Sequence, residues 1–283
     1  MARCVTAFSE AIFYAGHHEN SKVRHVVHNQ RSPWIYDTKT RSRIGAVLKL
    51  AAMAAGKTIA VVIPARNEAP IIAAVLTNIP AEIRSHPVIP IVIDDGSDDN
   101  TATAASSAGA IVVRHIANLG VGAATTTGFR AAQELNADIV VTMDADGQHD
   151  PRDIATLVEC LIDGPFDVVI GSRLLMHDGM PPSRFIANLL LNAVTFLVYG
   201  KIVSDSQSGF KAFTMKAVEK MELNCAGYEI CSEIIGEIYR KDFRYKSIPV
   251  RAVYTPYSRA KGQPFLNGVN LILGLFMRLV RRV

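Results

Sequence analysis

The chain has 283 residues, of which 49% are hydrophobic and 20% are charged, so it can bury one sizeable core. Its net charge of +4 is unevenly placed: residues 1–57 hold nine Lys and Arg against three Asp and Glu, and the remainder holds 21 against 23. The main body therefore lacks the basic excess of a nucleic-acid-binding domain. Four scattered cysteines without a C-x-x-C pair favour a reduced, cytosolic setting. No apolar run reaches 18 residues and no signal-peptide core is visible, so we expect neither a membrane span nor secretion.

Residues 1–56 form a basic N-terminal extension without a clear alternation of strands and helices. This extension carries four of the eight histidines and the only tryptophan, Trp34. Two hypotheses stay open. Either Met53 is the natural start and the preceding residues are poorly ordered, or the extension is a basic arm for an anionic membrane or for targeting to an organelle.

From residue 58 onward, short runs of Val and Ile alternate with helical segments. The predicted strands are residues 58–64, 88–93, 111–114, 138–143 and 167–170, and the predicted helices between them are residues 71–79, 100–108, 121–134 and 154–161. Apolar strands separated by helices predict an α/β fold, with a mostly parallel central sheet and helices on both faces. Ligands of such sheets bind beyond the carboxyl ends of the strands, where the main polar clusters of this chain lie.

The pattern changes after Gly171. We expect a long amphipathic stretch over residues 185–203, a short strand near 209–213, a helix over 228–239 and a strand over 246–250. Residues 265–283 predict an amphipathic helix with a cationic end, which either packs on the core or lies on a membrane surface. We therefore divide the chain into the extension (1–56), a catalytic domain (57–255) and a C-terminal amphipathic helix (256–283).

Polar loops follow the first two predicted strands. Their sequences are Pro64-Ala65-Arg66-Asn67-Glu68 and Asp94-Asp95-Gly96-Ser97-Asp98-Asp99. Carboxylates at neighbouring strand ends can accept hydrogen bonds from the donor edge of a base and from ribose hydroxyls. Gly96 permits a turn that exposes backbone N–H groups. The alternative for each loop is an ordinary polar turn with a helix cap.

The third predicted helix opens with a turn of small residues, Asn118-Leu119-Gly120-Val121-Gly122. This turn lacks the G-x-G-x-x-G spacing of a dinucleotide-binding loop, and it follows the third strand. We interpret it as close packing near a nucleotide. The chain also lacks the G-x-x-x-x-G-K-[ST] motif, which excludes a P-loop enzyme.

The fourth predicted strand leads directly into Asp144-Ala145-Asp146-Gly147-Gln148. Two carboxylates one residue apart, where a strand leaves the sheet, can turn toward one point in space. Such hard oxygen ligands suit Mg²⁺ or Mn²⁺, which usually keep water and substrate phosphate in their other positions. The alternative is an acidic turn in which Asp150 caps a helix whose first turn suits Pro151.

Together these motifs resemble the inverting glycosyltransferases of family two, which bind nucleotide sugars with a GT-A fold. The match runs from about residue 59 to about residue 250, and Gly171-Ser172-Arg173 is its fourth motif. The second half contains Ser183-Arg184 and the run from Asp205 to Phe213. It looks like the polyprenyl- and dolichyl-phosphate glycosyltransferases, the relatives of dolichyl-phosphate mannose and glucose synthases.

The resemblance implies roles for particular residues. The residues implied in nucleotide-sugar binding are Pro64, Ala65, Asn67, Glu68, Asp95, Gly96, Asn118, Gly122, Asp144 and Ala145. The residues implied in metal binding are Asp144, Asp146 and Gln148. Arg173, Arg184 and Ser208 would bind the acceptor phosphate, because guanidinium forks match its oxygens. The implied catalytic residues are Asp146, Arg173, Arg184 and Asp205, the last as a base or as an orienting group near the sugar. For Arg184 and Asp205 the alternative is a simple capping role.

The implied reaction is metal-dependent transfer of a hexosyl group to polyprenyl or dolichyl phosphate, with inversion. The donor is a nucleotide sugar, either UDP-glucose-like or GDP-mannose, and Gln207 and Lys211 make the chain more similar to the glucose type. The implied location is peripheral, on the cytoplasmic face of a membrane. Attachment would use the amphipathic segments, a membrane-anchoring partner or a homo-oligomer.

Two alternatives remain. A family member could act on a soluble or polysaccharide acceptor, which would need neither Arg173 nor Arg184 beside an apolar stretch. More remotely, the chain could be a non-catalytic carbohydrate- or membrane-binding module, which would bind its ligand without transferring any sugar.

Overall fold

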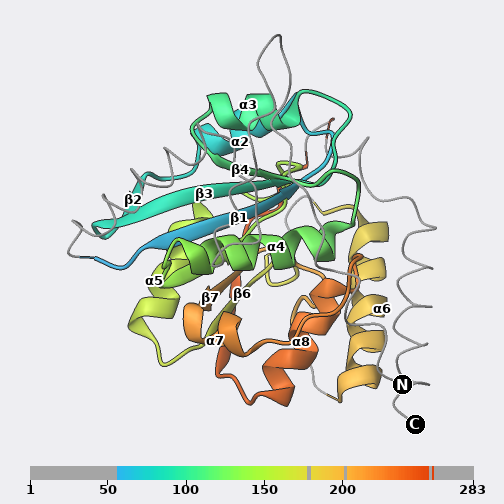
Figure 1. Cartoon of the computed structure of the whole chain (residues 1–283). Helices are drawn as coiled ribbons and strands as arrows, with labels where there is room; N and C mark the ends of the chain where they lie inside the picture. The colour runs from blue at the N-terminus through green and yellow to red at the C-terminus, as the bar shows by residue number, and fades with distance from the viewer. Residues whose placement is uncertain (1–55, 177–179, 201–202, 255–256, 258–283) are drawn as a thin grey trace, which may run out of the picture.

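The centre of the computed structural model, which describes residues 56–176, 180–200, 203–254 and 257, is a sheet of eight strands. Seven strands lie in the order β2-β3-β1-β5-β7-β6-β8, and β4 pairs with β3 (Figure 1). The strands are β1 (Ile59–Ala65), β2 (Glu82–Ile83), β3 (His86–Asp94), β4 (Ile111–Arg114), β5 (Ile139–Thr142), β6 (Val168–Ser172), β7 (Lys211–Thr214) and β8 (Tyr245–Pro249).

The sheet is mostly parallel, as the sequence predicts. Strand β1 runs parallel to β3 and β5, β3 runs parallel to β4, and β6 runs parallel to β8. Strand β7 is antiparallel to both of its neighbours, β5 and β6, and the short β2 is antiparallel to β3. Because β5 and β6 are both antiparallel to β7, they run parallel to each other. Their carboxyl ends therefore reach the same edge of the sheet as those of β1 and β3.

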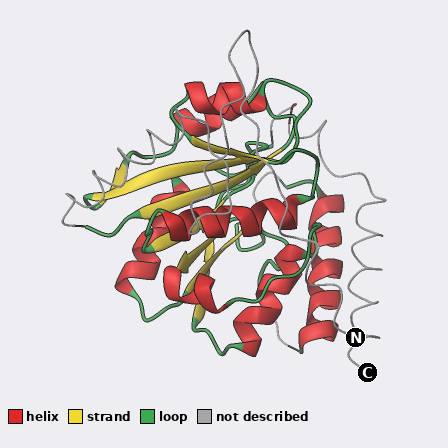
Figure 2. Cartoon of the chain, in the orientation of Figure 1, coloured by secondary structure: helices red, strands yellow, loops and turns green. Residues whose placement is uncertain are grey.

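Helices cover both faces of the sheet (Figure 2). They are α2 (Ile72–Thr77), α3 (Thr101–Ser107), α4 (Val121–Glu134), α5 (Asp153–Asp163), α6 (Pro182–Tyr199), α7 (Met215–Lys220) and α8 (Ile230–Arg240). The alternation of side chains along β1 explains the two layers. Ala60 and Val62 join a cluster with residues of α4, α7 and α8, whereas Ile59, Val61 and Ile63 join a second cluster with residues of α2, α3 and α5.

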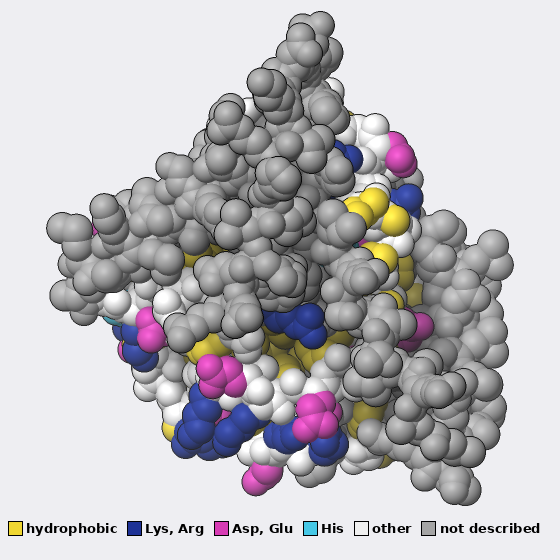
Figure 3. Space-filling model, in the orientation of Figure 1, with side chains coloured by type: hydrophobic (Ala, Val, Ile, Leu, Met, Phe, Trp, Pro, Cys, Tyr) yellow, Lys and Arg dark blue, Asp and Glu magenta, His cyan; other side chains and the backbone are white. Residues whose placement is uncertain are grey.

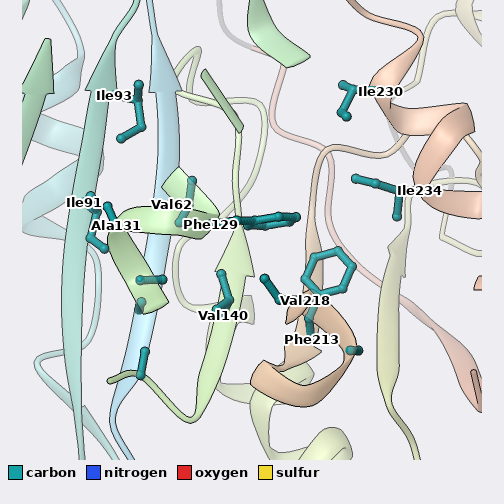
Figure 4. Close-up of a cluster of buried hydrophobic side chains, with 14 of the residues drawn as sticks. Val62, Ile91, Ile93, Phe129, Ala131, Val140, Phe213, Val218, Ile230 and Ile234 are labelled. Atoms are coloured by element: carbon teal, nitrogen blue, oxygen red, sulfur yellow. The ribbon is translucent and has the colours of Figure 1, made fainter. Parts of the chain in front are cut away.

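The cluster beneath α4 and α8 contains an aromatic pair (Figure 4). Phe129 of α4 meets Phe213 of β7 edge to face, with ring centroids 5.5 Å apart and an interplanar angle of 70°. Both rings are almost fully buried. Burial of a side chain of this size contributes about 1.5–3 kcal/mol, so the pair anchors α4 to the antiparallel strand β7.

Helix α6 begins and ends at residues that suit helix termini. Pro182 occupies its first turn, where the missing N–H costs nothing, and Gly200 ends it with a left-handed φ of 75°. The helix is therefore earlier and shorter than the predicted stretch of 185–203. It lies beside α8, where Thr195 Oγ1 is 3.3 Å from Ser232 Oγ. Among the described helices, none combines the length and apolarity needed to cross a bilayer.

Two short elements were not predicted. Strand β2 pairs with β3 through a turn at Arg84 and Ser85, whose φ values are 48° and 63°. Turns with positive φ usually carry Asn-Gly, and Arg-Ser does not match that pattern. Helix α7 has six residues and begins where the Thr214 hydroxyl accepts from the Ala217 N–H. Neither element is long enough to show a hydrophobic period. The expectations for residues 1–55 and 258–283 lie outside the described part of the chain.

Charged side chains of both signs are interspersed on the described part of the face shown in Figure 3. Some charged side chains form local ion pairs: Glu222 lies 3.1 Å from Arg240 and 2.6 Å from Lys241. Exposed pairs of this kind contribute little to stability, because water screens them. The fold is instead held by the two apolar layers.

Candidate active site

Four polar loops meet beyond the carboxyl ends of β1, β3, β5 and β6. The loops that follow β1 and β3 are joined by hydrogen bonds. The Asn67 N–H donates to the Ser97 hydroxyl (2.9 Å), and the Asp98 N–H donates to the Asn67 side chain (2.9 Å). Asn67 has a left-handed φ of 53°, a conformation that Asn tolerates better than most residues. The loop Pro64–Glu68 and the loop after β3 thus form one unit, with Pro64 and Ala65 closing β1.

Asp95 organises the loop that leads into α4. Its carboxylate accepts hydrogen bonds from the N–H groups of Leu119 (2.9 Å) and Gly120 (2.8 Å), and it lies 2.7 Å from His115 Nδ1. Burial raises the pKa of Asp95, but these hydrogen bonds outweigh burial and lower it below its usual value. Asp95 is therefore an anion that fixes the backbone around Asn118. The contact with His115, twenty positions along the chain, was not predicted from the sequence.

The glycines of the next turn permit the close packing that the sequence predicts. A Cβ on Gly122 would lie 2.2 Å from the Cys225 carbonyl oxygen. Gly96, in the loop after β3, is also crowded, since a Cβ there would lie 2.5 Å from the Ala117 carbonyl carbon. The N–H of Gly122 donates to the Ala226 carbonyl (2.6 Å). This N–H at the start of α4 therefore already has a protein partner, in agreement with the interpretation of the turn as close packing.

Asp144 and Asp146 leave β5 in different electrostatic states. Burial raises the pKa of Asp146, and the negative charge of Asp144 raises it further, to about 6. Burial alone would also raise the pKa of Asp144, but a hydrogen bond from His149 and the nearby cations Arg173 and Lys211 lower it. The Gln148 N–H donates to Asp146 Oδ1 (2.9 Å). The ionised form of Asp144 is thus stabilised by its neighbours, whereas ionisation of Asp146 is disfavoured by burial and by the charge of Asp144.

The donor set after β5 fits a divalent cation that also binds substrate. Within the described residues, no group of three His, Cys, Asp or Glu side chains could enclose a metal ion. The chain offers instead the two carboxylates of Asp144 and Asp146, with Gln148 beside them. A protein usually contributes one or two carboxylates to a Mg²⁺ site, and water and substrate phosphate oxygens complete the coordination.

Arg173 and Asp205 form a buried pair. Arg173 Nε and Nη2 donate to the two Asp205 oxygens (2.9 and 3.1 Å), and the Arg173 backbone N–H donates to the same carboxylate (3.1 Å). Burial raises the pKa of Asp205, but the Arg173 guanidinium outweighs burial and lowers it. The Arg173 pKa is raised in turn, since the Asp205 charge outweighs the effect of burial. A carboxylate held in this way is a poor proton acceptor.

The segment from Gln207 to Lys211 packs inward. Gln207 Nε2 donates to the Ser232 hydroxyl (2.9 Å), and the Lys211 ammonium group donates to the Ser208 carbonyl. Ser208 and Lys211 are almost fully buried. The Gly209 α-carbon lies so close to Asp144 that a Cβ there would be 2.3 Å from Oδ1. This segment therefore forms one wall around the first carboxylate.

Arg184 reaches the loop that holds the carboxylates, although it lies on another element. From the first turn of α6, its Nη1 donates to Gln148 Oε1 (3.3 Å). Its guanidinium also lies 5.4 Å from the centre of the Tyr254 ring. A second tyrosine, Tyr257, donates a hydrogen bond to Glu68 Oε2 (2.8 Å). Sequence reasoning missed both tyrosines, because nothing in their neighbourhood forms a motif.

Three comparisons with known proteins bear on this site. A family model described as glycosyl transferase family 2 matches residues 60–221. A UDP-N-acetylglucosamine--dolichyl-phosphate N-acetylglucosaminyltransferase of Methanococcus voltae is 36% identical over 245 residues, which cover 79% of this chain and 96% of that protein. A dolichol-phosphate mannosyltransferase of Pyrococcus furiosus is 30% identical over 221 residues, which cover 74% of this chain and 59% of that protein.

Solved structures share the fold. Glucosyl-3-phosphoglycerate synthase of Mycobacterium tuberculosis, in complex with Mn²⁺ and UDP-glucose, superposes with a TM-score of 0.59 at 25% identity, covering 84% of this chain and 82% of that one. The same enzyme with Mg²⁺ and UDP gives a TM-score of 0.57 at 25% identity, covering 82% and 83% of the two chains. The resemblance inferred from the motifs is thereby confirmed. The chain belongs to glycosyl transferase family 2 and is a glycosyltransferase with a GT-A fold.

Proposed function

We propose that this enzyme transfers a hexosyl group from a nucleotide sugar to polyprenyl or dolichyl phosphate, with inversion and with Mg²⁺ or Mn²⁺. The donor is UDP-glucose-like or GDP-mannose. The names of the Methanococcus voltae and Pyrococcus furiosus relatives, both of which act on dolichyl phosphate, support this acceptor class. The Mn²⁺ and Mg²⁺ complexes of the solved relative support a divalent cation.

The observation that carries the acceptor is the position of Arg184. This half-buried cation contacts Gln148 on the loop after β5, and it begins a helix whose outer side is apolar. On that helix, Ile186 is 57% exposed, Leu189 46% and Leu197 71%. A cation beside an exposed apolar helix suits a lipid with an anionic headgroup, and it suits peripheral contact with a membrane. A saccharide acceptor needs neither feature.

On the donor side, each loop has a proposed task. The residues Pro64, Ala65, Asn67, Glu68, Asp95, Gly96, Asn118 and Gly122 surround the nucleoside. Asp144, Ala145, Asp146 and Gln148 lie at the diphosphate, and Asp144, Asp146 and Gln148 hold the cation there. A bound cation would stabilise the charge that develops on the departing nucleoside diphosphate.

In the proposed reaction, an oxygen of the lipid phosphate attacks the anomeric carbon, and the bond from that carbon to the nucleoside diphosphate breaks. The attacking phosphate is already anionic at neutral pH, so the reaction needs no strong base. Because both oxygens of Asp205 are engaged by Arg173, we assign Asp205 the orienting role rather than that of a base. Arg173, Arg184 and Ser208 form the proposed acceptor side, and positioning supplies much of the acceleration.

The experiment that tests this proposal uses Arg184→Ala. Transfer is measured with radiolabelled UDP- and GDP-sugars, including UDP-N-acetylglucosamine, and with a short polyprenyl phosphate. We expect kcat/KM for the lipid to fall ~10-fold or more, since a charged hydrogen bond contributes about 1.5–3 kcal/mol. Donor affinity, measured by calorimetry, should be nearly unchanged. Arg184→Lys should recover only part of the loss, because a point charge cannot replace a planar fork.

Arg152→Ala is the matched control. Arg152 lies just after the same loop, is 76% exposed and pairs with Asp150 at 2.6 Å, so its loss should leave transfer nearly intact. Equal losses of transfer and of donor affinity in Arg184→Ala would assign Arg184 to the donor or to the fold. Transfer to a soluble phosphate such as 3-phosphoglycerate, without transfer to the lipid, would replace the proposed acceptor. The membrane role predicted for residues 265–283, testable with Phe276→Glu and liposomes, lies outside the described residues.

A further inference from the structure

The carboxylate of Asp144 is clamped from two sides. On one side, His149 Nε2 lies 3.3 Å from Asp144 Oδ2. On the other side, the Gly209 α-carbon packs against the carboxylate, and a Cβ there would come within 2.3 Å of Oδ1 and 2.5 Å of Oδ2. Arg173 and Lys211 also attract Asp144 through charge. Among the described residues, however, the directional hydrogen bond to this carboxylate comes from His149.

His149 is itself held firmly. Its side chain is 1% exposed, and its ring lies 4.9 Å from the Phe210 ring at an angle of 38°. Its backbone forms an isolated antiparallel bridge with Ala252. The ring therefore cannot swing away from Asp144 without displacing Phe210, which directly precedes β7, and the bridge fixes the backbone that carries the ring.

The other ring nitrogen indicates that packing alone does not explain this histidine. Nδ1 is buried and has no hydrogen-bond partner among the described residues. A buried polar atom without a partner costs about 1–3 kcal/mol, and a phenylalanine would fill the same space beside Phe210 without that cost. The contact that distinguishes histidine from phenylalanine here is the hydrogen bond from Nε2 to Asp144.

We propose that His149 is a positioning residue that holds the Asp144 carboxylate in the orientation required by the divalent cation. Gly209 contributes by leaving room for the carboxylate, since a side chain at this position would collide with it. This inference rests on the proposed metal role of Asp144, and it adds a residue that no motif assigned. Hydrogen bonds of this kind, made to a ligand rather than to the metal, orient ligands and commonly change metal affinity 10–100-fold.

The test compares His149→Phe with His149→Gln. Phenylalanine keeps the ring against Phe210 and removes the donor, whereas glutamine keeps an N–H donor at similar reach. The readout is Mn²⁺ binding in the presence of UDP and, separately, GDP, followed by the electron paramagnetic resonance signal of free Mn²⁺. We expect ~10-fold weaker binding or more for His149→Phe, and binding within a few-fold of wild type for His149→Gln. The melting temperatures of both variants are also measured, to detect any loss of stability.

Gly209→Ala tests the clamp from the opposite side and does not alter His149. It should weaken Mn²⁺ binding as well, since its methyl group must displace the Asp144 carboxylate. Mn²⁺ binding by His149→Phe at wild-type affinity would overturn the proposal and leave the proposed function standing. Equal loss in His149→Phe and His149→Gln, together with lowered melting temperatures, would also overturn it in favour of a purely structural role. Failure of the wild type to bind Mn²⁺ with either nucleotide would overturn the metal role of Asp144 itself, and this inference with it.

Discussion

Asp146→Asn should lower sugar transfer at least ~100-fold, because loss of one preorganised electrostatic contact in an active site commonly costs that much. The substitution keeps the shape of the side chain and removes one charge from the proposed cation site. In the wild-type chain, burial and the charge of Asp144 raise the pKa of Asp146 to about 6. A cation bound between the two carboxylates would relieve the repulsion that contributes to this raised pKa. The measurement is steady-state transfer with Mg²⁺ or Mn²⁺, for the variant and the wild type.

Asp150→Asn is the control for this prediction. Asp150 lies four residues further along the same loop, and its carboxylate is already occupied by Arg152. Its loss should change transfer far less than the loss of Asp146. Wild-type activity that is the same in EDTA as with added Mg²⁺ or Mn²⁺ would contradict the metal role of both Asp144 and Asp146.

The fold was predictable where the sequence has a period. Apart from the two-residue β2, each strand between Ile59 and Ser172 is rich in Val and Ile and is followed by a helix, so a mostly parallel sheet was the natural expectation. The antiparallel insertion of β7 was not predictable. Three of its four residues are buried and Thr214 is half-buried, and so short a buried run carries no sign of the direction in which the strand runs.

Candidate site residues were predictable where they stand next to strand ends, and the contacts between them were not. Asp144 and Asp146 are visible as a motif, but the approach of Gly209 to Asp144 joins residues far apart in the chain. Tyr257 and Glu68, which share a hydrogen bond, are separated by 189 positions. Gln207 and Lys211 illustrate the converse. In the sequence they made the chain more similar to the glucose-type synthases. In the structure, the hydrogen bonds that their side chains donate go to Ser206, Ser208 and Ser232 inside the protein.

Asp205→Asn should lower the free energy of unfolding by about 3–5 kcal/mol, since removal of one partner of a buried ion pair leaves an uncompensated charge. Asp205 is fully buried and the Arg173 side chain is 12% exposed, so water cannot replace the lost carboxylate. Asp163→Asn is the matched control. Arg84 also donates to both Asp163 oxygens, at 2.6 and 2.8 Å, but those side chains are 44% and 57% exposed. Loss of that exposed pair should change stability little. Denaturant unfolding at neutral pH measures both variants.

The same pair predicts a dependence on pH. The pKa of Asp205 is lowered in the folded chain, so its ionised form stabilises the fold at every pH above the unfolded pKa of about 3.9. That contribution is lost as the pH falls from this value through the lower pKa of the folded state. The stability difference between wild type and Asp205→Asn should therefore be constant from pH 7 to about pH 5 and should shrink below about pH 4. A difference that instead grows on acidification would mean that Asp205 is protonated in the folded protein, and it would return Asp205 to the role of a base.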